Sequence, residues 1–147
     1  MSYLSNADVE ERLGHANYVQ LTDDSGSGTA EEARVSEARL AAEGEVNSYL
    51  ARRYAVPVDV SLHPELAAVL KSVTLDLAEY RLYARRSPAP DEVRRKRDGA
   101  LQWLARVASG EAMLPAILEV AGNGAAGVSG AVVGSPRVLS REAMGKL

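Results

Sequence analysis

The sequence predicts an all-α protein, a small helical bundle of three long helices plus a short N-terminal helix, with an extended C-terminal arm. Apolar residues recur at steps of three and four in three long segments, which is the spacing of one helix face. Proline or glycine bounds these segments, and the last quarter is rich in glycine without a helical period. The 147 residues, 46% of them hydrophobic, suffice for one globular core. We place the bundle domain at residues 1–110 and the arm at residues 111–147.

The first predicted helix is short and begins after Ser5. Ser5 and Asp8 form the pattern of a capping box, in which each side chain accepts a hydrogen bond from the other residue's backbone. Gly14 then ends the helix, because glycine readily adopts the left-handed conformation found there. A connector without helical structure is expected from His15 onward, leading into an exposed, flexible loop at about residues 23–28.

The second predicted helix begins near Thr29, where Thr29 and Glu32 repeat the capping-box pattern, and runs to about Tyr54. A glycine in its middle, Gly44, costs about 1 kcal/mol of helix propensity, so we expect another backbone to approach closely there. The apolar stripe of this helix consists of Val35, Ala38, Ala42, Val46, Tyr49 and Leu50.

The third and fourth predicted helices begin at Pro64 and Asp91. The fixed φ of proline suits the first helical position, and the acidic first turn of the fourth helix suits the helix dipole. The third helix runs to about Arg86 and is apolar on more than one side, so it should be central and most buried. The fourth helix ends at Gly110. The inward residues of these helices are Leu66, Val69, Leu70, Val73, Leu75, Leu77, Tyr80, Leu82 and Ala84, then Val93, Ala100, Leu101, Leu104, Val107 and Ala108.

The segment Asn47–Val58, "NSYLARRYAVPV", joins the second helix to the third. Its apolar side chains belong to the inner stripe, whereas Arg52 and Arg53 follow at the helix C-terminus, where cations are favoured. We interpret the segment as a packed structural corner.

The sequence contains no pattern typical of a catalytic, cofactor or metal site. There is no cysteine, and the two histidines, His15 and His63, lie in contexts that favour structural roles. No nucleophile elbow, phosphate loop or zinc-protease motif is present. Asp23 and Asp24 are predicted to be exposed loop residues, with a cation site as the alternative. We therefore predict a protein that is not an enzyme and has no cofactor.

The sequence also predicts a soluble protein. The first residues lack the basic start and apolar run of a signal peptide. Residues 112–134 are poor in charge and about long enough to span a bilayer, but Pro115, Glu119, Asn123 and glycines interrupt them, so no membrane helix is expected.

Charge is unevenly distributed along the chain. Residues 1–50 carry ten acidic and three basic residues, whereas residues 51–110 carry eleven basic and seven acidic residues. This asymmetry indicates either a nucleic-acid face or pairing of acidic and basic helices, within the fold or between copies. The net charge of −3 favours pairing, because non-specific DNA binding needs a surplus of Lys and Arg.

The basic run Arg94-Arg95-Lys96-Arg97 is the best nucleic-acid candidate in the sequence. On a helix these residues spread around the circumference and form no continuous stripe. We expect them to pair with the acidic second helix or with a neighbouring subunit. The alternative function is a small helical DNA-binding regulatory protein that uses this run.

Several segments in their order resemble a known family. They are "YLSNADVEERLG", "QLTDD", "YLARRYAVPV", "LDLAEYRLY", "ALQWLARVASGEAML" and "SPRVLSREAM". Together they resemble the Mu-like phage and prophage proteins assigned to head–tail joining, which are similar to the helical connector (adaptor) proteins of long-tailed phages. The resemblance covers nearly the whole chain.

The resemblance implies a structural role in the virion. Such connectors form a ring, typically of twelve copies, beneath the portal protein, and join it to a tail, stopper or tail-terminator protein. Genome DNA passes through the ring without sequence-specific binding, and no residue is catalytic. The protein is then expected at the head–tail junction, and in the host cytoplasm during assembly. Predicted interface residues are Arg52, Arg53, Arg94, Arg95 and Arg97 in the bundle and Pro136, Arg137, Val138, Leu139, Arg141 and Met144 in the arm.

Overall fold

The computed structural model describes residues 2–115 and Ile117, and confirms the all-α class. The described residues form helices without strands. The helices are α1 (Asn6–Leu13), α2 (His15–Thr22), α3 (Glu32–Leu50), α4 (Pro64–Ala84) and α5 (Asp91–Ser109). No helix in this part of the chain is both long and apolar enough to cross a bilayer.

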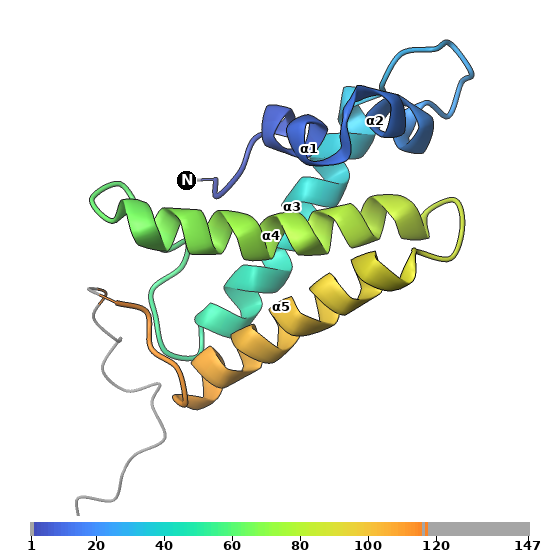
Figure 1. The fold of residues 1–147 in the computed structure, drawn as a ribbon. Coiled ribbons are helices and arrows are strands. Elements are labelled where there is room, and N and C mark those ends of the chain that lie inside the picture. The colour runs from blue at the N-terminus through green and yellow to red at the C-terminus, as the bar shows by residue number, and fades with distance from the viewer. Residues whose placement is uncertain (1, 116, 118–147) are drawn as a thin grey trace, which may run out of the picture.

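Helix α4 lies at the centre of the bundle and packs against each of the other helices (Figure 1). Helix α3 crosses behind α4, and α3 and α5 come together toward their C-terminal ends, while α1 and α2 cover the N-terminal half of α3. The central position predicted for the third helix of the sequence, which is α4, is therefore confirmed.

Two hydrophobic clusters meet on α4, which explains why its apolar residues exceed one face. Leu66, Leu70 and Leu77 enter the larger cluster, which also contains the C-terminal halves of α3 and α5. Leu75 and Leu82 point instead into a second cluster formed with α1, α2 and the start of α3. A helix that buries two faces needs leucines on both, so the widened stripe in the sequence is a consequence of its central place.

The first helix begins and ends as predicted, but the prediction of a connector without helical structure after it is wrong. Ser5 Oγ accepts from the Asp8 amide at 3.3 Å and Asp8 Oδ2 accepts from the Ser5 amide at 2.7 Å, which completes the capping box. Gly14 ends α1 with φ of +76°. The chain then forms α2, whose first residue is His15. This helix has only two turns and no side-chain cap. Its apolar residues are therefore too few to show a helical period in the sequence.

Helix α3 corrects three expectations. It begins at Glu32 after an uncapped Glu31, and the Thr29 amide donates to Ser27 Oγ, so the second capping box is absent. It ends at Leu50, and a turn follows before Tyr54. The expected backbone approach at Gly44 is also wrong, since a methyl group there would meet no atom within 4 Å.

The ends of the last two helices agree with the sequence. Pro64 occupies the first turn of α4, with His63 at the N-cap position, although the His63 side chain makes no capping bond. Helix α5 ends at Gly110, which has φ of +89°. Leu114 beyond it is buried in the larger cluster, and Ile117 packs against that cluster. The core of the bundle therefore extends past the glycine that ends α5.

Candidate interaction surfaces

Two tyrosine hydroxyls hold the irregular segments of the bundle in place. The Tyr3 hydroxyl accepts from the buried Val58 amide at 2.8 Å and donates to Asn47 Oδ1 at 2.6 Å. The Tyr54 hydroxyl accepts from the buried Leu114 amide at 3.0 Å. Burial raises the pKa of the Tyr3 phenol. These bonds, together with the burial of Tyr54 and Val58, confirm that residues 47–58 form a packed corner.

Ion pairs join the acidic N-terminal part of the chain to α4 and to the two arginines that follow it. They join Asp8 to Lys71 (2.5 Å), Arg12 to Asp76 (2.8 Å), Glu45 to Arg81 (2.7 Å), and Asp24 to Arg85 (2.6 Å) and Arg86 (2.8 Å). A hydrogen bond from Lys71 lowers the pKa of Asp8, and hydrogen bonds from Arg85 and then Arg86 lower the pKa of Asp24. Of the explanations that the sequence left open for the uneven charge, pairing of acidic and basic segments within the fold is therefore present.

The basic run on α5 pairs with its own helix. The pairs are Arg94 with Asp91, Lys96 with Glu92 (3.2 Å) and Arg97 with Asp98 (3.1 Å). The Arg97 guanidinium also lies 4.5 Å from the centroid of the Tyr80 ring on α4. The expected pairing of this run with the second predicted helix, which is α3, is therefore wrong. Carboxylates beside three of the four cations also reduce the attraction of this run for phosphates.

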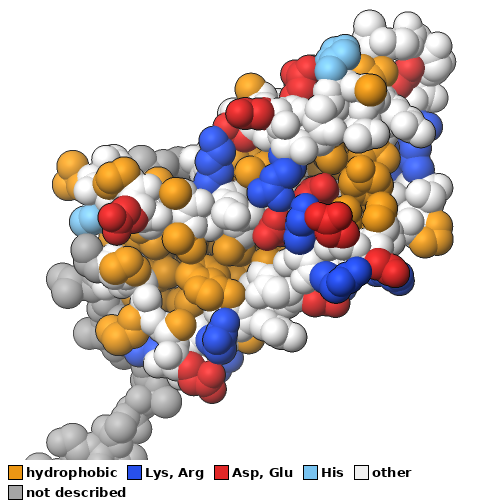
Figure 2. Space-filling model, in the orientation of Figure 1, with side chains coloured by type: hydrophobic (Ala, Val, Ile, Leu, Met, Phe, Trp, Pro, Cys, Tyr) orange, Lys and Arg blue, Asp and Glu red, His pale blue; other side chains and the backbone are white. Residues whose placement is uncertain are grey.

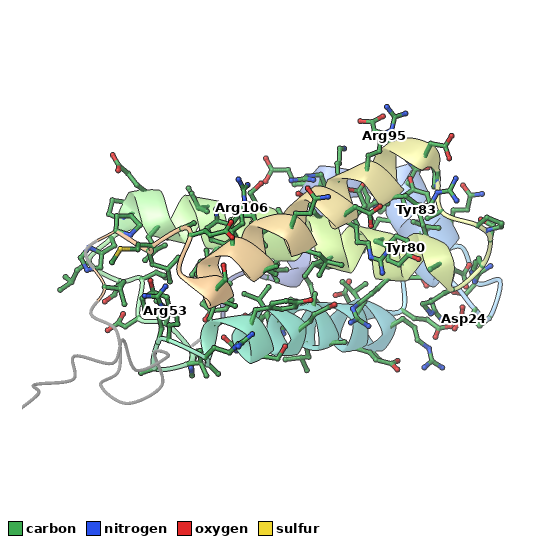
Figure 3. All side chains as sticks on the ribbon, turned by 90° about the horizontal axis from the view of Figure 1, so that it is seen from below. Asp24, Arg53, Tyr80, Tyr83, Arg95 and Arg106 are labelled. Carbon is green, nitrogen blue, oxygen red and sulfur yellow. The ribbon has the colours of Figure 1, made fainter. Side chains whose placement is uncertain are left out.

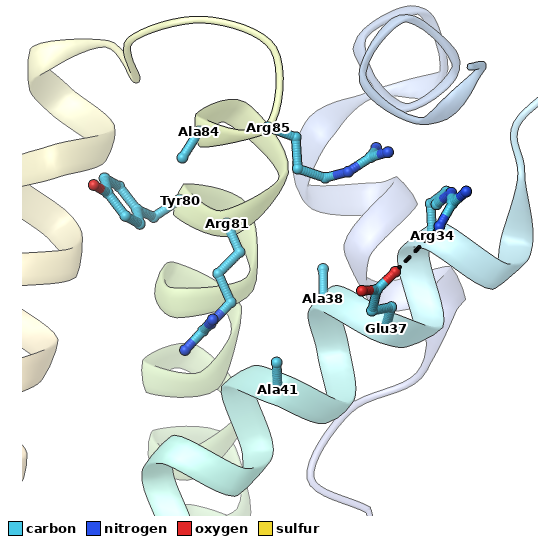
Figure 4. Close-up of a pocket in the computed structure, with 8 residues that line it drawn as sticks. All are labelled: Arg34, Glu37, Ala38, Ala41, Tyr80, Arg81, Ala84 and Arg85. Atoms are coloured by element: carbon cyan, nitrogen blue, oxygen red, sulfur yellow. Dashed lines mark hydrogen bonds and ion pairs between the residues drawn. The ribbon is translucent and has the colours of Figure 1, made fainter.

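A groove separates the N-terminal half of α3 from the C-terminal half of α4 (Figure 4). It has a volume of about 360 Å³. Its lining residues are Arg34, Glu37, Ala38 and Ala41 of α3, Tyr80, Arg81 and Ala84 of α4, and Arg85, which caps the end of α4. Three alanines leave the space open, while arginines from both helices stand at its edges. The α3/α4 groove thus offers a small apolar floor with a rim of arginines that are paired with carboxylates.

The opposite end of α4 exposes apolar side chains. Leu62 is 83% exposed in the turn before α4, and Met113 is 65% exposed in the segment after α5. Residues 62–66 and Pro115 line a hollow of about 270 Å³ between these two segments. Figure 2 shows hydrophobic side chains gathered over this end of α4, with an acidic side chain among them. Exposed apolar groups gathered in this way are typical of interaction sites.

Comparison with protein families decides the affiliation of this helical bundle. The family model described as "Bacteriophage Mu, Gp36" matches residues 3–128, which include all five helices and the segment after α5. The chain belongs to this family. The predicted resemblance to Mu-like phage proteins is confirmed. A search of individual curated proteins gave no match.

In this member of the Bacteriophage Mu Gp36 family, the arginines predicted as interface residues do not form one patch. Arg52 is exposed in the turn after α3, and the Arg53 guanidinium lies against Gly110 at the end of α5. Arg94 and Arg95 are exposed near the start of α5. Figure 3 shows Arg53 and Arg95 toward opposite ends of the bundle. The predicted arm residues, Pro136, Arg137, Val138, Leu139, Arg141 and Met144, lie outside the described residues.

His15 and the loop carboxylate Asp23 of this Gp36-family chain have structural contacts. His15 Nδ1 lies 2.7 Å from Glu10 Oε1 on an exposed side of α2. Asp23 accepts from the backbone amides of Ser27 (3.0 Å) and Gly28 (2.7 Å), which closes the exposed loop. Hydrogen bonds from these amides, that of Gly28 first, lower the pKa of Asp23. Within residues 2–115 and Ile117, no three His, Asp or Glu side chains are grouped so that they could hold a metal ion.

Sequence reasoning missed both the α3/α4 groove and the apolar end. Two of the groove alanines, Ala38 and Ala84, belong to the predicted helix stripes, and the spacing of a stripe does not indicate how far two helices diverge. The apolar end had a usable signal, since Leu62 stands in a turn two residues before the proline that starts α4. A large aliphatic residue in such a turn is often exposed, because a tight turn has little core to face.

Proposed function

We propose that the protein is a structural head–tail connector (adaptor or head-completion protein) of a tailed phage or prophage-derived particle. The observation that carries this proposal is the family match, because it runs through the whole helical bundle of a chain that resembles connectors in its motifs. The proposal assigns the protein no catalytic residue and no cofactor. Its work is then to fit other proteins.

The surfaces of the bundle support a role in assembly. A ring needs a heterologous interface, in which one face of each subunit meets a different face of the next. The bundle has two dissimilar surfaces at opposite ends of α4, the apolar end and the α3/α4 groove. A chain that carries both can bind on two sides at once.

The proposal places a ring of copies, typically twelve, beneath the portal protein, with a tail, stopper or tail-terminator protein on the other side. Genome DNA passes through the ring without being read. Candidates for contacts with these partners are the exposed arginines Arg52, Arg94 and Arg95 and the arm residues Pro136, Arg137, Val138, Leu139, Arg141 and Met144. The site of action is the head–tail junction of the virion, after synthesis in the host cytoplasm.

Removal of the gene from the phage or prophage tests this function. We expect lysates to contain DNA-filled heads and separate tails, seen by negative-stain electron microscopy, because the joining step alone is lost. Wild-type protein supplied from a plasmid should restore joined particles. Normal joined particles in the absence of the chain would overturn the assignment.

A further inference from the structure

We infer that the Leu62 turn of one copy binds in the α3/α4 groove of a second copy, so that copies join head to tail. This inference rests on the proposed function for its setting, a ring, and on the geometry of the two surfaces for the contact itself. The occupant of the groove is thus a second copy of this chain.

The Leu62 turn is a fixed projection with an apolar tip. The His63 amide donates to the Val60 carbonyl at 3.0 Å, and the Ser61 amide donates to Asp59 Oδ1 at 2.9 Å. These bonds hold the turn while the Leu62 side chain stays 83% exposed at its tip. An ordered turn loses little conformational freedom on binding, so burial of its leucine is not offset by a large ordering cost.

The α3/α4 groove offers the matching recess. Its floor consists of Ala38, Ala41 and Ala84, of which Ala41 and Ala84 remain accessible. A volume of about 360 Å³ admits a branched aliphatic side chain together with part of the turn that carries it. Figure 4 shows Arg81 beside α4, whereas the Arg85 side chain reaches from the end of α4 toward the N-terminal end of α3 and so bounds one end of the groove.

Charges next to the two surfaces are complementary. Asp59 and Glu65 flank Leu62 in the sequence and are exposed. Arg81 and Arg85 stand at the rim of the groove, beside one lining carboxylate, Glu37, and Arg85 already pairs with Asp24 at 2.6 Å. Arg81 donates through Nη2 to Glu45, yet a guanidinium carries five N–H donors, so it can also receive a carboxylate from outside. Carboxylates around the leucine would therefore orient the turn over the groove.

Distance excludes the same contact within one molecule. Leu62 comes two residues before the first residue of α4, and Ala84 is the last residue of that helix. The helix has 21 residues, so its ends are about 30 Å apart at 1.5 Å per residue. A molecule cannot place its own turn in its own groove, and every copy has both surfaces to offer. The contact therefore uses two different faces, which is the heterologous type that builds rings.

Engineered thiols provide a direct test, because the chain has no cysteine. Ser61→Cys places a thiol beside Leu62, and Ala84→Cys places one on the groove floor. The two variants, one of them labelled with ¹⁵N, are mixed in equal amounts at high protein concentration and oxidised. Intact-mass spectrometry then separates mixed from like-with-like disulfide dimers. Mixed dimers should dominate, since a disulfide forms only where Cα atoms come within about 7 Å, whereas random collision makes half of the dimers mixed.

Matched controls separate a specific contact from chance collision. As a control for Ala84→Cys, Leu40→Cys puts a thiol on α3 at a position that is 58% exposed and outside the groove, and its pairing with Ser61→Cys should be statistical. Adding Leu62→Ser to the Ser61→Cys chain should return its pairing with Ala84→Cys to the statistical value. Leu62 is so exposed that this change leaves the fold intact, which circular dichroism verifies.

The chain with both Ser61→Cys and Ala84→Cys tests the head-to-tail geometry. Oxidation should give a ladder of dimers, trimers and larger species on a non-reducing gel. A product that stops at the dimer would show a two-fold pair and overturn the head-to-tail contact. Statistical mixing in the first experiment would overturn the contact itself. Neither result bears on joined particles in the gene-removal experiment, so failure of this inference is distinguishable from failure of the proposed function.

Discussion

Replacement of Tyr54 by phenylalanine tests how the segment after α5 is held to the bundle. The Tyr54 hydroxyl is the acceptor for the buried Leu114 amide, at 3.0 Å. Tyr54→Phe keeps the ring in the core and removes only this acceptor. A buried N–H without a partner costs about 1–3 kcal/mol. In a domain of this size, each kcal/mol lowers the melting temperature by about 2–4 °C, so the transition should fall by several degrees.

The assay is thermal unfolding followed by circular dichroism, with Tyr83→Phe as the matched control. Tyr83 is partly buried, and its hydroxyl makes no hydrogen bond to the described residues. Its loss should change the free energy of unfolding by no more than about 0.5 kcal/mol. Equal melting temperatures for the two variants would refute the reasoning.

Hydrogen exchange adds a local readout to the same prediction. In the wild-type protein the Leu114 amide should exchange slowly, because it is buried and bonded. Tyr54→Phe should speed that exchange while the Val58 amide, which is bonded to the Tyr3 hydroxyl, stays protected. Loss of protection at both amides would indicate general unfolding and not the loss of one bond.

Further predictions concern stability, pH, the arm and DNA. Gly44→Ala should raise the free energy of unfolding by about 1 kcal/mol in urea titrations, because a methyl group is unopposed there. Gly110→Ala should lower the free energy of unfolding, since φ is +89° and the Arg53 guanidinium occupies the place of the added methyl group. A stabilising Gly110→Ala together with a destabilising Gly44→Ala would contradict these contacts. Lowered pKa values of Asp8 and Asp24 stabilise the fold above their unfolded pKa of about 4, and this contribution is lost as pH falls through the folded values. The urea midpoint should therefore decrease as the pH is lowered from about 5 to about 3. Asp8→Asn should weaken this pH dependence, and a wild-type midpoint that does not change with pH would contradict the prediction. Deletion of residues 118–147 should leave the helical dichroism intact and abolish incorporation into particles, whereas an unfolded product would place the arm in the core. Duplex DNA titrated at physiological salt should bind weakly and without the steep salt dependence of a protein that contacts several phosphates, and tight salt-sensitive binding would favour the regulatory alternative.

Local signals in the sequence predicted the long helices well. The proline at the start of α4 and the glycine at the end of α5 fixed one boundary of each helix, because the backbone preferences of these residues act within a turn. Leu75 and Leu82 widen the apolar stripe of α4, and this width alone indicated that the helix is central. The Thr29 and Glu32 pattern misled, since Glu31 bonds instead to the amides of the preceding loop.

Contacts between distant segments were beyond the reach of the sequence. Asp24 and Arg85 are 61 residues apart, and nothing in their neighbourhoods indicates that they pair. The α3/α4 groove likewise depends on the crossing of two helices, which side-chain spacing constrains only loosely. The family assignment came from motifs along the chain, while the two complementary surfaces needed the structure.

A cryo-electron microscopy reconstruction of the neck of the assembled particle tests the central claim most directly. We predict a ring of helical bundles directly beneath the portal, into which α1–α5 fit, with the Leu62 turn of each copy facing the α3/α4 groove of the next. Density at the head–tail junction that does not accommodate this bundle, or the chain found at another place in the particle, would contradict the account.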